Sequence, residues 1–245
     1  MNGFPWLTVA GALPLAGAIV ISLIPALPPD SAQADRHARE AAAKWLALAF
    51  SLATLVVVLV IAVKFQIGGP NYQFTEDYSW ISQFGVHYAL GVDGIALVLI
   101  AMTAVLMPVV ILASWNDADP PAGEGAAAAA ADAPVTRPRR STKAYFAMML
   151  VLETMMVGVF AATDVFLFYV FFEAMLVPMY FLIGSFGTGQ RQYAAVKFLL
   201  YSLFGGLLML VAVIALYVYS AHGGHPGTFM FQDLTHMTFS PTVQK

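Results

Sequence analysis

The chain has 245 residues, of which 60% are hydrophobic and only 10% are charged, and its net charge is −3. A soluble domain carries about 25% charged residues, so this chain has too little polar surface to cover a water-soluble core. A soluble globular enzyme is therefore excluded, and the small net charge argues against nucleic acid as a partner. The absence of cysteine removes thiolate ligation of zinc or iron–sulfur clusters, disulfides and thiol catalysis. The composition predicts an all-α polytopic membrane protein.

Six apolar runs are each long enough for a transmembrane helix, which needs about 20 residues. Because lipid offers the backbone no hydrogen-bond partners, each run is expected to be helical. Pro108 and Pro178 lie inside the third and fifth runs, where membrane helices tolerate a kink. Gly205 and Gly206 in the sixth run are interpreted as a site of close helix packing. The runs are Phe4–Leu27, Trp45–Val63, Gly94–Ser114, Ala144–Thr163, Val165–Phe186 and Phe198–Ala221.

The distribution of Lys and Arg predicts the orientation. Eight of these residues follow the first, third and fifth runs, and two lie on the opposite side. By the positive-inside rule, the N-terminus is outside and the loops Pro28–Lys44, Asn116–Lys143 and Gly187–Gln192 are cytoplasmic. The alanine-rich loop 116–143 is expected to be disordered, without catalytic content. The aromatic segment Phe65–Gly91 is expected to fold or to lie at the outer membrane interface.

Glu153 and Glu173 are carboxylates inside the fourth and fifth runs. Because an intramembrane charge is costly, it favours a functional site facing the bundle interior. The structural alternative is a protonated acid that hydrogen-bonds a neighbouring helix. Each glutamate lies ten residues from a turn near Thr163–Asp164, which is ~15 Å of helix. Both are therefore expected near the middle of a ~30 Å hydrocarbon core.

A polar stripe surrounds Glu173. Tyr169 lies four residues before it and Tyr180 seven residues after it, which places the three side chains on one helical face. A hydrogen-bonded proton path along this face is predicted. Pro178 leaves the carbonyl of Ala174 without its helical partner, and that carbonyl is expected to hold a water.

Lys197 opens the sixth run, and Tyr201 follows one turn later. The lysine is expected ~12 Å away from Glu173 in depth, so a relay through water or Tyr201 is weighed against a snorkelling anchor at the cytoplasmic face. The Walker loop and the dinucleotide fingerprint are both missing. His222 and His225 lack further ligands nearby, so neither a metal site nor a cofactor site is predicted in this chain.

Four stretches resemble the antiporter-like M subunits of bacterial NADH-quinone oxidoreductase (respiratory complex I). Phe172–Gly184, reading FEAMLVPMYFLIG, corresponds to the fifth-helix motif of that family. Leu90–Ile95 (LGVDGI), Gly158–Phe168 (GVFAATDVFLF) and Ala195–Tyr201 (AVKFLLY) also agree. The resemblance implies six transmembrane helices of an antiporter-like fourteen-helix fold. It also implies proton translocation driven by quinone reduction elsewhere in the complex.

The resemblance assigns roles to individual residues. Glu173 takes the place of the family's essential fifth-helix glutamate, Lys197 matches a lysine at the start of the sixth helix, and Glu153 matches an acid found in some relatives. NADH, FMN, iron–sulfur clusters and quinone would be bound elsewhere in the complex. The implied partners are other membrane subunits and the lipid bilayer of a bacterial inner membrane.

One family element is missing from the sequence. The family pairs its glutamate with a lysine on a broken seventh helix, in a stretch like KMPxxPxHGWLPDAH. No such stretch occurs, so residues 1–245 are expected to be the N-terminal part of a longer subunit. A subunit of a multi-subunit Na⁺/H⁺ antiporter or of a membrane-bound hydrogenase remains an alternative. A non-catalytic membrane scaffold, whose two acids join helices, is the other.

Overall fold

The computed structural model describes residues 4–25, 33–116, 141–187, 189–221 and 227–237. Six of the helices in these ranges are long and apolar enough to cross a membrane, which confirms the six predicted spans. A short helix and a two-stranded hairpin, whose strands are joined by the 3-10 helix η1 (Ser82–Phe84), complete the described elements. The helices are α1 (Trp6–Leu23), α2 (Gln33–Lys64), α3 (Gly94–Ala113), α5 (Thr142–Ala161), α6 (Val165–Phe186), α7 (Arg191–Ser220) and α8 (Phe231–His236), and the strands are β1 (Gln73–Ile81) and β2 (Val86–Val92).

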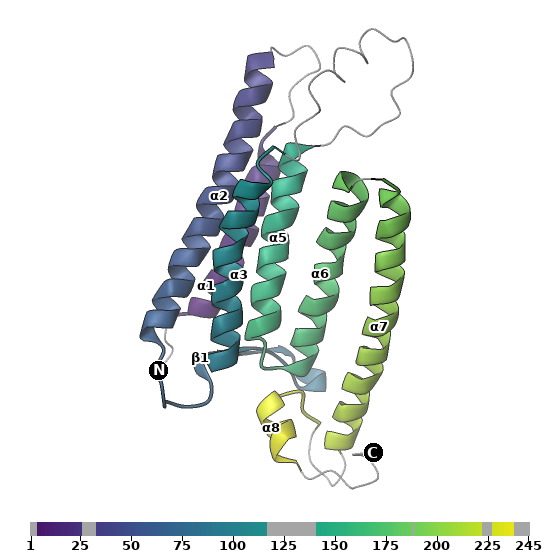
Figure 1. Ribbon diagram of the computed structural model, residues 1–245. Coiled ribbons are helices and arrows are strands. Elements are labelled where there is room, and N and C mark those ends of the chain that lie inside the picture. Colours follow the sequence, from purple (N-terminus) through teal and green to yellow (C-terminus); the bar gives the residue numbers. More distant parts are fainter. Residues whose placement is uncertain (1–3, 26–32, 117–140, 188, 222–226, 238–245) are drawn as a thin grey trace.

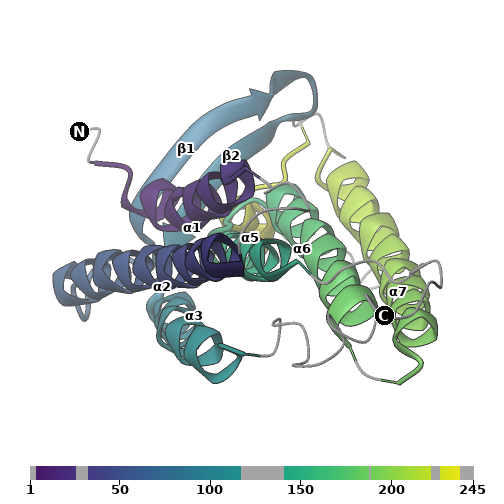
Figure 2. The same ribbon diagram turned by 90° about the horizontal axis from the view of Figure 1, so that it is seen from above.

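Helix α5 lies at the centre of the bundle and packs against α1, α2 and α3. Helix α6 packs on the remaining side of α5, and α7 packs on α6, so these two helices extend from the four-helix group (Figures 1 and 2). Much of the apolar surface of α7 is exposed, including Leu203, Phe204 and Leu207. The α5–α6 hairpin therefore joins the packed group to an open helical face.

Two helices begin earlier than the apolar runs indicate. Helix α2 begins at Gln33 rather than near Trp45, and α7 begins at Arg191 rather than at Phe198. Both extensions contain alanines and other good helix formers, so the helix continues beyond the hydrophobic stretch. The prediction of a loop up to Lys44 is therefore wrong for residues 33–44.

The aromatic segment between α2 and α3 is folded, as predicted, into an antiparallel hairpin. Its register runs from Gln73↔Val92 to Ile81↔Val86, with an irregularity between Gln73 and Glu76. Phe74 lies in this irregular stretch with a φ of 54°. Bulges of this kind redirect side chains, and Glu76 is buried.

Glu76 caps the N-terminus of α1, which has no side-chain cap of its own. Its Oε1 accepts from the Leu7 N–H at 2.8 Å, and both carboxylate oxygens accept from the Thr8 N–H at 3.3 Å. The Thr8 hydroxyl donates to Oε2 and lies 3.2 Å from the Tyr88 hydroxyl. Burial raises the pKa of Tyr88, so this phenol is neutral. A carboxylate at this place also opposes the positive end of the helix dipole, and it fixes the hairpin to α1.

The turn between α5 and α6 is also tied to the hairpin. The Thr163 N–H donates to the Ala89 carbonyl at 2.9 Å, and the Thr163 carbonyl accepts from Phe231 at 3.0 Å. Asp164 is fully buried, and its Oδ2 accepts from the His87 N–H at 3.0 Å. Its Oδ1 caps α6 by accepting from the N–H groups of the first turn. The helix pair that carries both glutamates is thereby anchored at one end.

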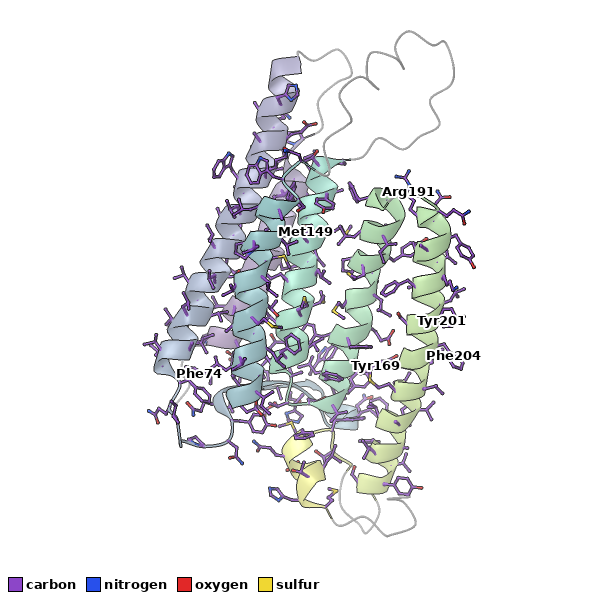
Figure 3. All side chains as sticks on the ribbon, in the orientation of Figure 1. Phe74, Met149, Tyr169, Arg191, Tyr201 and Phe204 are labelled. Carbon is purple, nitrogen blue, oxygen red and sulfur yellow. The ribbon has the colours of Figure 1, made fainter. Side chains whose placement is uncertain are left out.

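Basic side chains cap helices at the opposite end of the bundle. Helices end with carbonyl groups that lack partners, and cations are favoured there. Figure 3 marks the two ends with Phe74, near the hairpin, and Arg191. The donors and their carbonyl acceptors are Lys143 to Ile24 at 2.7 Å, Arg39 to Pro25 at 2.6 Å and Arg191 to Ser185 at 2.9 Å.

The predicted disordered loop and the two histidines near the C-terminus fall largely outside the described residues. Most of the predicted disordered loop, residues 117–140, lies outside the described residues. The histidines 222 and 225 also lie outside them.

Candidate functional site

The two intramembrane glutamates lie at equal depth in the α5–α6 hairpin. Glu153 is eight residues before Ala161, the last residue of α5, and Glu173 is eight residues after Val165, the first of α6. Each is therefore ~12 Å from the turn along its helix. The side chains face opposite directions, since Glu153 meets α2 and Glu173 meets α7. The structure does not bring the two carboxylates together.

Glu153 is completely buried in a polar layer between two apolar clusters of the four-helix group. The Ser51 hydroxyl of α2 lies beside it. Neither carboxylate oxygen of Glu153 nor Ser51 Oγ has a hydrogen-bond partner among the described residues. The nearby hydroxyls of Thr54 and Thr154 donate to carbonyls of their own helices. Among these hydroxyl groups, Ser51 is therefore the one whose proton is not already used within its own helix, and it lies beside the Glu153 carboxyl group.

Glu173 projects from α6 toward α7. Its Oε1 is buried and has no hydrogen-bond partner among the described residues. The carboxyl group packs against Gly206, and a Cβ added to that glycine would overlap Oε1 and the carboxyl carbon. The carboxylate therefore occupies the place that a side chain at position 206 would take.

The predicted stripe on α6 is present as a helical face. Tyr169 lies one turn before Glu173 on α6, where Figure 3 labels it. Tyr180 lies two turns after Glu173, and the buried Pro178 lies inside the helix. No hydrogen bond joins Glu173 Oε1 to either tyrosine in the described structure, so a path along this face requires bridging groups.

Lys197 and Tyr201 lie on a different face of α7. The Lys197 ammonium group lies 5.9 Å from the ring centre of Tyr193 and 6.0 Å from that of Tyr201. Tyr201 is 71% exposed and projects away from α6 with Phe204 (Figure 3). Lys197 precedes Gly206 by nine residues, which is two and a half helical turns and ~13.5 Å. Lys197 is therefore on the side of α7 opposite to the Glu173 contact.

Two residues of the site were missed by the sequence-based assignment. Ser51 was not singled out, although Ser51 and Thr54 are the only hydroxyl-bearing residues in the run Trp45–Val63. Gly206 was assigned to helix packing together with Gly205. Only Gly206 contacts another helix, since a Cβ on Gly205 would meet nothing within 4 Å.

One cavity lies away from both glutamates. Its volume is about 730 Å³, and it opens at the hairpin end between the residues following α2 and helix α8. Among the described residues, no group of three or more His, Asp or Glu side chains is arranged to hold a metal ion. The candidate site therefore consists of the two separate carboxyl groups and their neighbours.

Comparison with protein families and curated proteins places this site in context. Residues 162–244 match the family model described as NADH:quinone oxidoreductase/Mrp antiporter, TM. NADH-quinone oxidoreductase subunit M of Mycobacterium tuberculosis is 46% identical over 244 residues, covering 96% of this chain and 42% of the relative. The subunit M of Rhodobacter capsulatus is 39% identical over 212 residues, covering 86% and 36%. The chain thus spans about two-fifths of the length of these relatives.

Solved structures share the fold. A chain of respiratory complex I from Thermus thermophilus with bound NADH superposes with a TM-score of 0.70 at 22% identity, covering 96% of this chain and 40% of that one. A chain of the Mrp complex from Dietzia sp. DQ12-45-1b gives a TM-score of 0.64 at 20% identity, covering 94% and 21%. These likenesses confirm the predicted antiporter-like membrane fold.

Proposed function

Because the chain belongs to the NADH:quinone oxidoreductase/Mrp antiporter family of membrane subunits, we propose that it is part of a proton-translocating subunit of NADH-quinone oxidoreductase. The subunit would couple electron transfer from NADH to quinone with proton movement across the membrane. The observation that carries this proposal is Oε1 of Glu173, which lies buried within a transmembrane helix and has no hydrogen-bond partner among the described residues. The names of the curated relatives support the assignment to this complex.

Glu173 is the proposed proton carrier. A carboxyl group in an apolar span can bind and release a proton when a charged partner approaches or leaves. Tyr169 and Tyr180, on the same face of α6, would supply hydroxyl groups for the proton path, bridged by water. The Ala174 carbonyl, left without a helical partner by Pro178, is a suitable acceptor for such a water.

Glu153 is proposed as a second, separate proton-binding group. A protonated carboxyl group donates one hydrogen bond, and Ser51 Oγ lies beside it to accept. Loss of that proton would leave a charge in a dry layer, which costs several kcal/mol unless a partner compensates it. Glu153 therefore fits either a slow proton reservoir or a hydrogen bond between α5 and α2.

Lys197 and Tyr201 are assigned to a different step from the protonation of Glu173. They lie on the face of α7 that none of the described helices covers. A lysine between two tyrosine rings can present its charge to a neighbouring element while its stem stays in apolar surroundings. We propose that this face continues the proton path beyond α7.

The subunit would reside in a bacterial inner membrane with the hairpin end outside and the Arg191 end in the cytoplasm, as the basic residues predict. Its partners would be other membrane subunits. NADH, FMN, iron–sulfur clusters and quinone would be bound elsewhere in the complex, with no cofactor in this chain.

A subunit of a multi-subunit Na⁺/H⁺ antiporter is the second candidate. The structural likeness to a chain of the Mrp complex from Dietzia favours it. Such a subunit would use the same carboxylates but would exchange ions without oxidising NADH. The two candidates therefore differ in the energy source that moves the proton.

Purification of the full-length subunit from its native membrane separates these candidates. An affinity tag on the subunit should recover a complex that oxidises NADH with quinone. After reconstitution into vesicles, NADH should generate a pH gradient in sodium-free buffer, and a protonophore should collapse it. A pH gradient that forms only when a sodium gradient is applied would assign the chain to the antiporters.

A further inference from the structure

We propose that Gly206 of α7 forms the packing site of the Glu173 carboxyl group and acts as a positioning residue for proton transfer. This site, where the Glu173 carboxyl group packs on the Cα of Gly206, is termed the seat. The inference rests on the proposed role of Glu173. The site accepts a single carboxyl group. Glycine, which has no side chain, leaves a gap in the surface of α7, and the Glu173 side chain of the facing helix α6 fills that gap.

The register of the α6–α7 pair supports a specific contact between Glu173 and Gly206. These helices approach closely at two places, Gly184 with Ala195 and Glu173 with Gly206. The two contacts are eleven residues apart on each helix, about three turns, so they lie on one antiparallel seam. At the first contact a small residue faces a glycine, as in ordinary close packing of membrane helices. At the second, a glutamate faces the glycine.

The α7 side of the seam consists of small or branched residues. The buried residues of α7 recur at intervals of eleven, seven and seven, which keeps them on one face. Lys197 and Tyr201 lie outside this face. The residues are Ala195, Gly206, Val213 and Ser220. The carboxyl group of Glu173 is thus held against a face with no side-chain charge.

The contact fixes where the acidic oxygen lies. Oε1 stands along the direction in which a Cβ would leave the Gly206 Cα, so it faces a Cα–H group, a weak donor that recurs at helix–helix interfaces. A weak donor orients the carboxyl group without neutralising it strongly. Proton transfer needs a carrier at hydrogen-bond distance from its donor and acceptor. The seat therefore sets the depth and direction of the carrier while leaving the proton exchangeable.

A single methyl group tests the seat, and the chain offers a matched control. Gly206→Ala places a methyl group where Oε1 lies, so the Glu173 side chain must leave its position. Gly205→Ala adds the same methyl group one residue earlier, where no neighbour lies within 4 Å. Both variants have the same gain in helix propensity. Differences between them report on the seat.

In the full-length subunit within its assembled complex, Gly206→Ala should lower NADH-driven proton pumping roughly ten- to hundred-fold, because a displaced catalytic group costs that much. Gly205→Ala should pump within about two-fold of wild type, the range expected of a surface change. The Glu173→Asp variant, one methylene shorter, withdraws the carboxyl group from the seat. In that background, adding Gly206→Ala should have no further effect, as expected when two residues act through one contact.

If the Gly206→Ala subunit fails to assemble, the yield of assembled complex replaces pumping as the measured quantity. Adding Glu173→Asp to Gly206→Ala should then restore assembly. A second readout uses a hydrophobic carbodiimide, which reacts with protonated carboxyl groups, followed by mass spectrometry of the peptide holding residue 173. Gly206→Ala should change the labelling rate of Glu173 several-fold, and Gly205→Ala should not.

The proposal would be overturned if Gly206→Ala lowered proton pumping by the same factor in the Glu173 and Glu173→Asp backgrounds and left carbodiimide labelling of Glu173 unchanged. Gly206 would then be a packing residue. Failure of the underlying function has a different signature. Glu173→Gln would then pump at the wild-type rate, whatever the labelling experiment shows for Gly206.

Discussion

Glu173 and Lys197 lie on opposite sides of helix α7. The Glu173 carboxyl group rests against Gly206, whereas the Lys197 ammonium group projects from the other face between the rings of Tyr193 and Tyr201. The helix therefore separates an acidic and a basic group of the proposed proton path. Within the described part of the chain, these groups act on different neighbours.

This separation predicts a limited effect of the Lys197→Met variant on Glu173. Because the two groups are ~13.5 Å apart along α7, carbodiimide labelling of Glu173 should stay within about two-fold of wild type, as for distant sites. NADH-driven proton pumping in vesicles should slow, since a later step loses its cation. A large change in Glu173 labelling would show that the lysine acts on the glutamate directly.

The Glu153 layer predicts a coupled pair. Glu153→Gln and Ser51→Ala should each reduce proton pumping by less than about ten-fold, and the double variant should lose no more than the stronger single one. Thr54→Val is the matched control, because the Thr54 hydroxyl donates to the carbonyl of Phe50 in its own helix. Additive losses from the two single variants would place Ser51 and Glu153 in independent roles.

The cap that Glu76 of the hairpin forms on α1 predicts that two neighbouring acids on β1 contribute differently to stability. Glu76→Ala removes charge-assisted hydrogen bonds to Leu7 and Thr8 and should cost about 2 kcal/mol, which lowers Tm by roughly 5 °C. Asp77→Ala removes an exposed pair with His87, for which less than about 1 kcal/mol is expected. Thermal unfolding in detergent measures both. Equal shifts would argue against the cap.

The orientation predicts opposite labelling at the two ends of the bundle. Gln83 lies at the hairpin tip and Gln190 at the Arg191 end, and both are exposed. In a cysteine-free full-length subunit, Gln83→Cys should react with an impermeant maleimide added to intact cells, and Gln190→Cys should react only after lysis. The reverse pattern would invert the topology.

The sequence was sufficient for the six spans because lipid forces an apolar run of that length into a helix. It was sufficient for the equal depth of Glu153 and Glu173 because both are counted from one short turn. The strands could not be predicted, since the register of β1 is interrupted beside Phe74 and its exposed residues include the large aromatic side chains of Tyr78 and Trp80.

The facing of side chains was also beyond the sequence. The sequence alone does not distinguish Gly205 from Gly206. Only the packing of α6 against α7 makes Gly206 the residue that contacts Glu173. Sequence alone predicts loops at the polar starts of α2 and α7, because the length of an apolar run marks the membrane core and not the end of a helix. These properties depend on packing between distant segments.

The most direct test of the central claim is the rate of NADH-driven proton pumping, measured together with the rate of NADH oxidation, by a complex with Glu173→Gln in the full-length subunit. Glutamine keeps the size of the side chain but cannot exchange a proton at neutral pH. The complex should assemble normally, while reconstituted vesicles should show proton pumping, and the NADH oxidation coupled to it, largely lost. Normal assembly with wild-type rates of both pumping and NADH oxidation would contradict the role of Glu173 as the proton carrier.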